Sequence, residues 1–279
     1  MLIMGCKTRF WALLVCVLIA AGCTTGHRRI TIGFAGLDTP SKHFDGRMTL
    51  PEEAATPLPA VMLVHGSAGV DSRYDFHRPE LLAAGMATFE VDFKTGVFTN
   101  LSNRPPIPVF LPWVFGALQA LRAHPAIDPE RIAIMGFSLG GHLAISAASR
   151  QSVERWMGDV QQGFAAHVGF YPVCRWLRSR FTVDGCTGAP MLILTAGKDS
   201  WGDGETCPPF EQWINTAEPG LLELIVYPGV HHGFDRRGTW RGYAPLARNH
   251  SAVLQWNSDA AHDSRHRATA FLQSVFGLQ

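Results

Sequence analysis

The sequence contains seven short apolar segments that alternate with stretches of helical character. The apolar segments are residues 29–36, 60–66, 87–93, 131–137, 165–171, 190–197 and 221–229. Most are continuous apolar runs, which mark strands buried on both faces. The helical stretches cover residues 76–85, 109–125, 139–150 and 264–276. This alternation predicts an α/β fold, with a mostly parallel central sheet and helices on both of its faces.

The composition fits one large folded domain, or at most two small ones. The chain has 279 residues, of which 47% are hydrophobic and 17% are charged, so a sizeable core is available and disorder is not expected. The formal net charge is +1, and no basic run occurs. A nucleic-acid partner is therefore not expected, because such partners need a clustered positive surface.

The N-terminus has the layout of an export signal. Lys7 and Arg9 precede the apolar run 10–21, and the sequence then reads Ala-Ala-Gly-Cys up to Cys23. We expect residues 1–22 to be a signal peptide of the lipoprotein type and Cys23 to be lipidated. Plain export with cleavage near Gly22, or a retained anchor, are the alternatives. The lipoprotein interpretation, which we prefer, predicts a tether at residues 23–28 and a folded domain at residues 29–279. It also predicts a location in the bacterial cell envelope, periplasmic or at the outer surface.

Export also defines the redox environment of the remaining cysteines. If Cys23 is acylated and the signal is removed, Cys174, Cys186 and Cys207 are left. An oxidising compartment favours one disulfide among the three and leaves one free thiol. The sequence alone leaves the pairing open.

The strongest motif is Gly-Phe-Ser-Leu-Gly at residues 136–140, centred on Ser138. It fits the pattern G-x-S-x-G and sits between an apolar strand and a helix rich in small residues. This is the context of a nucleophile elbow, a sharp turn that lifts a serine hydroxyl above a sheet. The start of the new helix directs its positive end at a developing oxyanion. Ser138 is therefore the candidate nucleophile.

A serine hydroxyl needs a base, and the base needs an orienting acid. In α/β-hydrolases the chain order is Ser, then Asp or Glu, then His. Asp199 follows the strand at 190–197, and the histidine pair 231–232 follows the strand at 221–229. Asp203 and Asp235 are rivals for the acid. Adjacent residues in an extended loop point in opposite directions, and Gly233 allows a close approach, so His232 is preferred as the base.

The oxyanion hole of such a site uses two backbone N–H groups. One belongs to the residue after the nucleophile, here Leu139, and the other comes from the loop after an earlier strand. Ser67, in the segment VMLVHGSAG, is the best placed for the second. His65, in the same segment, is expected to be structural.

Together these residues resemble the dienelactone hydrolase family of α/β-hydrolases, from about residue 45 to the C-terminus. The matching pieces are VMLVHGSAG, GFSLGG, FYPVC, LTAGKDSW, Cys207 and YPGVHHGFD. The resemblance implies an α/β-hydrolase domain at 29–279, in which the base is His232 and the acid is Asp199. It also implies a disulfide between Cys174 and Cys207, with Cys174–Cys186 as the alternative.

The chain departs from the family pattern in two places. Members that hydrolyse dienelactone use a cysteine nucleophile where this chain has Ser138, and a glutamate where it has Gly66. The resemblance thus implies a general ester or lactone hydrolase. Phe137, Trp113, Tyr74 and Trp201 are candidates for the lining of a substrate pocket, with ordinary packing against the sheet as the alternative. Arg104, Arg175 and Arg178 are candidates for binding a substrate carboxylate.

We therefore expect an exported serine hydrolase that cleaves small carboxylic esters or lactones through an acyl-enzyme. It would need neither metal nor organic cofactor, and its lipidated N-terminus would be its contact with a membrane. A peptidase or an acyltransferase is the alternative among enzymes. Outside enzymes, the alternative is a non-catalytic envelope protein that uses the same fold for binding or as a scaffold.

Overall fold

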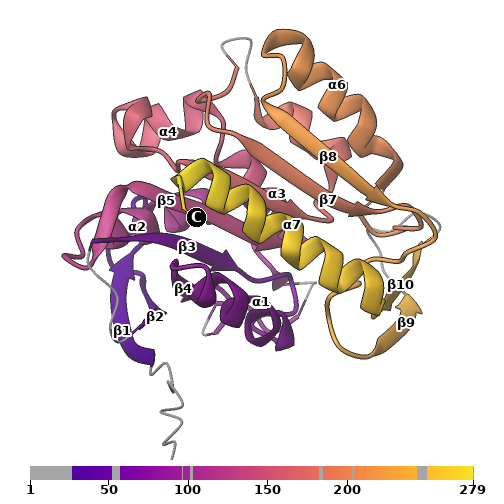
Figure 1. The fold of residues 1–279 in the computed structure, drawn as a ribbon, viewed down its shortest axis with the longest axis horizontal. Helices are drawn as coiled ribbons and strands as arrows, with labels where there is room; N and C mark the ends of the chain where they lie inside the picture. The colour runs from indigo at the N-terminus through magenta and orange to yellow at the C-terminus, as the bar shows by residue number, and fades with distance from the viewer. Residues whose placement is uncertain are drawn as a thin grey trace, which may run out of the picture.

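The computed structural model describes residues 27–51, 57–95, 97–100, 103–181, 185–202, 204–243 and 250–278. Its centre is an eight-stranded sheet with the order β1-β2-β4-β3-β5-β6-β7-β8 (Figure 1). Strands β4, β3, β5, β6, β7 and β8 run parallel, whereas β1 pairs antiparallel with β2 and β2 antiparallel with β4. The predicted mostly parallel sheet is thereby confirmed.

The strands of this sheet are β1 His27–Ala35, β2 His43–Pro51, β3 Leu58–Val64, β4 Ala87–Val91, β5 Ile127–Phe137, β6 Ala166–Phe170, β7 Met191–Ala196 and β8 Leu222–Tyr227. The α-helices are α1 Ser72–Ala83, α2 Leu111–Arg122, α3 Leu139–Ser146, α4 Arg150–Met157, α5 Cys174–Leu177, α6 Cys207–Ala217 and α7 Ser258–Phe276. Two short strands, β9 Thr239–Tyr243 and β10 Ser251–Gln255, form a separate antiparallel pair.

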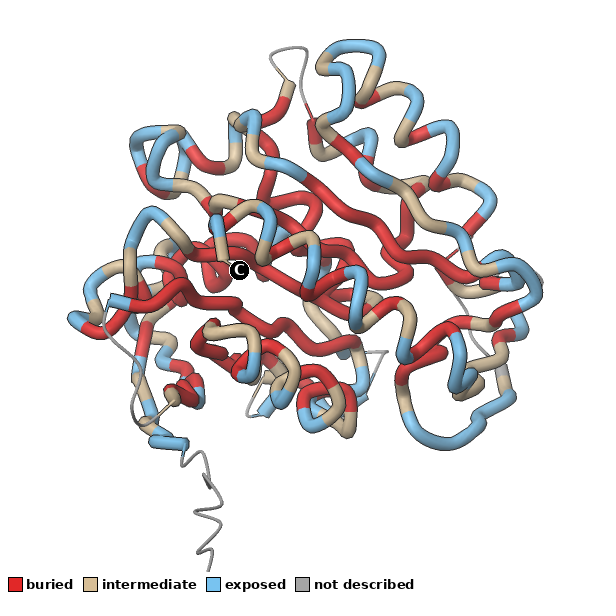
Figure 2. Tube along the Cα trace, viewed as in Figure 1, coloured by how far each residue is buried: buried red, intermediate tan, exposed pale blue. Residues whose placement is uncertain are grey.

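Helices cover both faces of the sheet, as predicted. On β3, Val61 and Leu63 join the core that packs under α1 and α7, and Met62 and Val64 join the core under α2 and α3. Alternate residues of one strand thus feed two cores, which explains why its sequence is apolar without interruption. Figure 2 shows the strands as the buried centre of the molecule.

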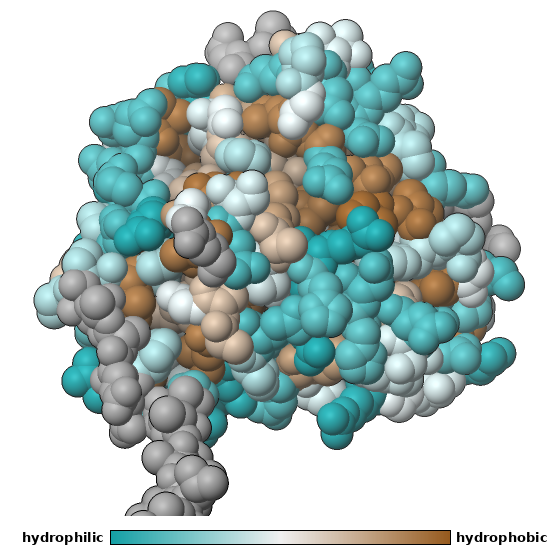
Figure 3. Space-filling view, in the orientation of Figure 1, coloured by the Kyte–Doolittle hydropathy of each residue, from teal (hydrophilic) through white to brown (hydrophobic). Residues whose placement is uncertain are grey.

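One edge of the sheet is β8, which is less buried than the strands at the centre. Val226 on this strand is 38% exposed, and Figure 3 shows apolar surface in the region of β8. Among the helices that the structure describes, none combines the length and the apolar character needed to cross a membrane.

Several boundaries differ from the sequence expectation. Strand β1 begins at His27, two residues inside the expected tether 23–28, and the rest of that tether and the expected signal lie outside the described residues. Helix α1 begins at Ser72 rather than 76, because Asp71 accepts a hydrogen bond from the N–H of Arg73. Helix α7 begins at Ser258 rather than 264, because Asn257 caps it through the N–H of Ala260. Strands β2, β9 and β10 and helices α4, α5 and α6 were not predicted.

A disulfide joins the start of α5 to the start of α6. Cys174 and Cys207 are bonded, with their Cα atoms 5.0 Å apart. This is the pair that the family resemblance implies. Cys186 is free and buried, and burial raises the pKa of its thiol to about 12. Cys186 packs in a further apolar core, which includes Phe210 and Ile214 of α6, and a raised pKa disfavours its thiolate form.

We expect the disulfide to stabilise the fold. It spans 33 residues, so its loss should lower the free energy of unfolding by about 3–4 kcal/mol and the melting temperature by about 10 °C. Differential scanning calorimetry with and without dithiothreitol measures this, with the double variant Cys174→Ala/Cys207→Ala as the control. Reductant should lower the melting temperature of the native chain and leave that of the double variant unchanged. An equal effect of reductant on both proteins would contradict the expectation.

Candidate active site

Ser138 lies in the turn between β5 and α3. Its φ of 56° and ψ of −108° are a conformation that a residue other than glycine holds only when its surroundings impose it. Its backbone N–H donates to the carbonyl oxygen of Phe170, at the end of β6, over 2.9 Å. The strained turn therefore fixes the serine hydroxyl at the carboxyl end of the two central strands.

The turn closes only because its neighbours have no side chains. A Cβ at Gly136 would lie 2.0 Å from the carbonyl oxygen of Gly140, and a Cβ at Gly140 would lie 2.0 Å from that of Val64. Both approaches are backbone contacts that cannot give way. The G-x-S-x-G pattern is thus a steric requirement at this point, where β5, α3 and β3 meet.

His232 bridges Ser138 and Asp199. Its Nε2 lies 2.9 Å from the Oγ of Ser138, and its Nδ1 lies 2.7 Å from the Oδ2 of Asp199. An ionised carboxylate can only accept, so Nδ1 carries the proton and Nε2 is left to accept from the serine hydroxyl. This is the tautomer that a serine hydroxyl needs in order to lose its proton.

Asp199 is held in a turn that aims its second oxygen away from the histidine. Its Oδ1 accepts from the backbone N–H groups of Trp201, at 2.9 Å, and Gly202, at 2.6 Å. The residue is 6% exposed. A Cβ at Gly202 would lie 2.7 Å from Oδ2, so the turn needs glycine there. Asp199 thus contacts His232, the position that the sequence analysis expects for the acid, whereas its rival Asp203 lies outside the described residues.

Two aromatic rings hold the imidazole of His232 between them. Trp201 stacks on it, with ring centroids 5.9 Å apart and an interplanar angle of 21°. Tyr171 meets it edge-on, with centroids 4.6 Å apart. The backbone of His232 is fixed as well, because its carbonyl oxygen accepts from the N–H of Gln255 in β10. The ring therefore has little freedom to leave Ser138.

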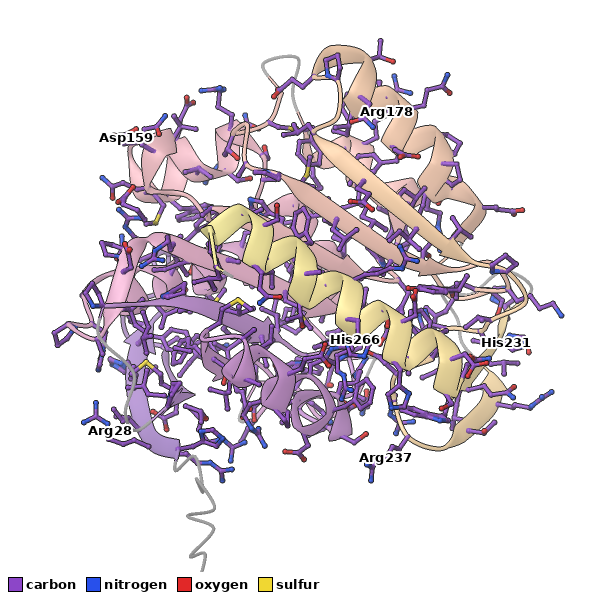
Figure 4. The ribbon with its side chains drawn as sticks, in the orientation of Figure 1. Arg28, Asp159, Arg178, His231, Arg237 and His266 are labelled. Atoms are coloured by element: carbon purple, nitrogen blue, oxygen red, sulfur yellow. A yellow bond between two sulfur atoms is a disulfide. The ribbon has the colours of Figure 1, made fainter. Side chains whose placement is uncertain are left out.

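His231 does not take part in this set of contacts. Its side chain lies at the end of the molecule where β9 and β10 lie (Figure 4). The ring is partly exposed, and its Nδ1 has no hydrogen-bond partner in the part of the chain that the structure describes. Gly233 follows His232 with a φ of +65°, so the chain turns directly after the two histidines. The preference for His232 agrees with the geometry.

A second buried histidine–carboxylate pair lies under the loop of His232, and it was not predicted. Asp235 is fully buried and accepts from the Nε2 of His77 at 2.8 Å and from the hydroxyl of Tyr171. Arg73 contacts the same tyrosine oxygen at 3.3 Å and makes two 2.8 Å bonds to Asp71. Asp235, a rival for the acid, is therefore engaged elsewhere and holds the histidine loop to β6 and α1.

The expected oxyanion donors border the nucleophile. Ser67 and Leu139 line, together with Ser138, a small chamber beside the turn. His65 is structural, as predicted. Its Nε2 accepts from the N–H of Phe93 at 2.9 Å, which leaves Nδ1 to donate to the carbonyl oxygen of Gly66 at 2.7 Å, and burial lowers its pKa.

A larger cavity of about 360 Å³ opens beside the histidine. Trp201, Trp240 and Leu254 form its apolar wall, so the unpredicted pair β9–β10 contributes two of its residues. Three cationic side chains, Arg73, Lys94 and Arg236, lie on its border. The cavity reaches both Ser138 and His232 and is large enough for a small organic molecule. Within the described ranges, no group of three His, Cys, Asp or Glu side chains is arranged to hold a metal ion.

Comparisons with known proteins agree with this geometry. The model of the dienelactone hydrolase family matches residues 110–276. A curated protein of Bradyrhizobium, named as a probable 2-oxo-3-(5-oxofuran-2-ylidene)propanoate lactonase, is 24% identical over 224 residues, which are 72% of this chain and 81% of that protein.

Solved structures of esterases share the fold. The esterase of Pyrobaculum calidifontis is 17% identical and has a TM-score of 0.61 over 90% of this chain and 87% of its own. The Thermogutta terrifontis esterase Est2 is 20% identical and has a TM-score of 0.62 over 85% of this chain and 89% of its own.

The family match covers more than half of the chain and includes the segments of Ser138, Asp199 and His232. The relatives and structural neighbours are hydrolases of ester bonds, and their fold is the one described above. The chain belongs to the dienelactone hydrolase family, whose members are ester-bond hydrolases on the α/β-hydrolase fold.

Proposed function

We propose that this protein is a serine hydrolase that cleaves carboxylic esters or lactones through an acyl-enzyme. The observation that carries the proposal is the continuous chain of two hydrogen bonds, 2.9 Å from Ser138 to His232 and 2.7 Å from His232 to Asp199. In this proposal Ser138 is the nucleophile, His232 the general base and then the general acid, and Asp199 the orienting carboxylate.

The reaction would begin when the Oγ of Ser138 attacks the ester carbonyl carbon and passes its proton to the Nε2 of His232. Asp199 stabilises the imidazolium that forms. The protonated Nε2 then gives the proton to the leaving alkoxide, so the C–O bond breaks and the alcohol departs. A water molecule attacks the acyl-serine in the same way, loses a proton to His232, and releases the acid and free Ser138.

The negative charge on the carbonyl oxygen would be stabilised by the backbone N–H groups of Ser67 and Leu139. Leu139 is the first residue of α3, whose N-terminal dipole points at the same place. Each such donor contributes about 100- to 1,000-fold to the rate. These two assignments rest on the position of both residues beside Ser138.

The larger cavity supports a small ester or lactone as substrate. Its apolar wall suits a carbon skeleton, and Arg73, Lys94 and Arg236 suit an anionic group on that skeleton. The Bradyrhizobium relative is named for a lactone that carries a propanoate group. A lactone is therefore the second substrate class to test, beside open-chain esters.

We also propose that the protein is anchored in the cell envelope through Cys23. The supporting observations are the basic and apolar pattern of residues 7–21 and the Ala-Ala-Gly-Cys sequence that follows it. Strand β1 begins four residues after Cys23, so a lipid there would sit close to the folded domain. The signal at 1–22 and its cleavage belong to the same proposal.

Labelling with a fluorophosphonate tests the nucleophile. The folded protein should form a covalent adduct on Ser138, which tryptic mass spectrometry locates, and Ser138→Ala should lose both the adduct and hydrolysis of p-nitrophenyl acetate. Heat-unfolded protein is the control and should not react. An unlabelled Ser138 in folded protein would favour the non-catalytic binding protein instead.

The chain offers matched controls for the other two residues. His232→Ala should lower kcat on p-nitrophenyl acetate by about 10⁴-fold or more, and His231→Ala by less than about threefold. Asp199→Asn should lower kcat by about 10⁴-fold. Asp235→Asn, which alters the other buried histidine–carboxylate pair, should chiefly lower the melting temperature. If His231→Ala were the inactive variant, or Asp235→Asn the slower of the two aspartate variants, the assignment would be wrong.

The lipid anchor is tested by phase separation. Full-length protein expressed with its own N-terminus should enter the Triton X-114 phase and incorporate labelled palmitate. Cys23→Ala should remain in the aqueous phase without the label, while its esterase activity after solubilisation is unchanged. A native protein that stays in the aqueous phase would refute the anchor without touching the assignment of Ser138.

A further inference from the structure

The candidate active site lies at the carboxyl edge of the sheet. The larger cavity beside Ser138 is lined by residues from the loops that follow β3, β4, β5, β7 and β8, among them Ser67, Lys94, Trp201 and His232. These loops leave the carboxyl ends of parallel strands, which all lie at one edge. A substrate must therefore approach the protein from this edge.

The described part of the chain begins at the other edge. Strand β1 is antiparallel to β2, which is antiparallel to β4, so β1 runs in the same direction as the parallel strands. Arg29 pairs with Thr49, and Thr49 pairs with Thr88 near the start of β4. Arg28 lies close enough to His124, which precedes β5, to lower the pKa of that histidine together with burial. The first residues of β1 thus lie at the amino edge of the sheet.

The two edges are separated by the length of the strands. Strand β3 has seven residues, which span about 20 Å. Its last residue, Val64, pairs with Gly136, and Ser138 lies two residues further on, about 25 Å from the amino edge. Figure 4 shows Arg28 and His231, the neighbour of the candidate base, on opposite sides of the molecule. The active site and the start of β1 are therefore far apart.

The segment between Cys23 and β1 is short in comparison. Cys23 precedes His27, the first residue of β1, by four residues, and four residues reach at most about 14 Å. If the active site faced a membrane, the start of β1 would stand about 25 Å above the membrane surface. Acyl chains on Cys23 could not then remain in the bilayer. A lipid on Cys23 and an active site that faces the same membrane thus exclude each other.

We infer that the anchored protein turns its active site away from the membrane that holds it, and that its substrates are water-soluble esters or lactones rather than esters embedded in that membrane. The inference rests on the triad and the anchor proposed above. Arg28 and Arg29 at the start of β1 are exposed, and their positive charge suits the anionic headgroups of a membrane surface. The amino edge is then the face that lies next to the lipid.

One ester presented in two forms tests the inference. The p-nitrophenyl ester of N-glutaryl-dioleoylphosphatidylethanolamine places the ester at the surface of a vesicle, and the same ester on glycerophosphoethanolamine is soluble. Native lipidated protein, reconstituted into the vesicles, is compared with Cys23→Ala added at equal concentration. Both proteins should hydrolyse the soluble form with equal kcat/KM. On the embedded form the anchored protein should gain less than about threefold, whereas a site that faced the membrane would gain about 100-fold from its effective concentration.

A longer tether supplies the matched variant. Insertion of 20 Gly and Ser residues between Gly26 and His27 raises the r.m.s. reach of the tether to about 27 Å and leaves the folded domain unchanged. The anchored insertion variant should hydrolyse the embedded ester at least about tenfold faster than the native protein, with the soluble ester unaffected. The same insertion in Cys23→Ala is the control and should change neither rate.

Energy transfer to a rhodamine-labelled lipid measures the orientation without turnover. A fluorescein fluorophosphonate labels Ser138, and fluorescein maleimide labels Arg28→Cys at the amino edge. In the anchored protein we expect stronger transfer from position 28 than from Ser138. The same labels on chains that also carry Cys23→Ala are the control and should show little transfer. Equal transfer from the two positions, or stronger transfer from Ser138, would contradict the inferred orientation.

The outcomes separate this inference from the proposed function. If the native protein gains about 100-fold on the embedded ester, the inference is refuted and the triad stands. If Cys23 carries no lipid, the inference falls with the anchor, while labelling of Ser138 still supports the triad. If Ser138 labels but neither form of the ester is accepted, the energy transfer decides the orientation. If Ser138 does not label and no ester is hydrolysed, the proposed function fails, and the assignment of substrates fails with it.

Discussion

The close backbone contacts around Ser138 are the constraint on which the rest of the structure depends. Gly136, Gly140 and the carbonyl oxygen of Val64 approach to distances that exclude any side chain, and Ser138 itself holds a φ of 56°. Such a conformation costs on the order of 1–3 kcal/mol, which the packing of the two apolar cores against β3 and β5 must offset. This packing maintains the strained turn, and the turn places the serine hydroxyl at the edge of the sheet.

The order of the strands explains how three distant residues reach one another. Strands β3, β5, β6, β7 and β8 are parallel neighbours, so the loops that follow them lie at one edge of the sheet. This made Ser138, Asp199 and His232 predictable, because each follows a continuous apolar run and needs no long-range information to be placed at that edge. The mostly parallel fold was predictable for the same reason, whereas the family was predictable from the resemblance of the motifs around these residues.

Other parts of the structure depend on pairings that the sequence does not display. Strand β2 has polar residues on its exposed face, and β9 and β10 pair with each other outside the central sheet, so no single segment revealed these strands. The contact between Asp235 and His77 joins residues 158 positions apart.

The two buried histidine–carboxylate pairs show why such a pair does not by itself define a catalytic site. His77 packs against the rings of Phe137 and Phe170, and its Nδ1 has no hydrogen-bond partner among the described residues. His232 has a similar carboxylate on one nitrogen but a serine hydroxyl on the other and a cavity beside it. In the proposed reaction, a proton that moves from Ser138 to His232 would go on to the leaving group, whereas no described residue accepts a hydrogen bond from, or donates one to, the Nδ1 of His77. The two pairs differ in what lies beside the ring nitrogen that does not contact the carboxylate. For His232 that neighbour is the hydroxyl of Ser138, which the strained turn holds in place.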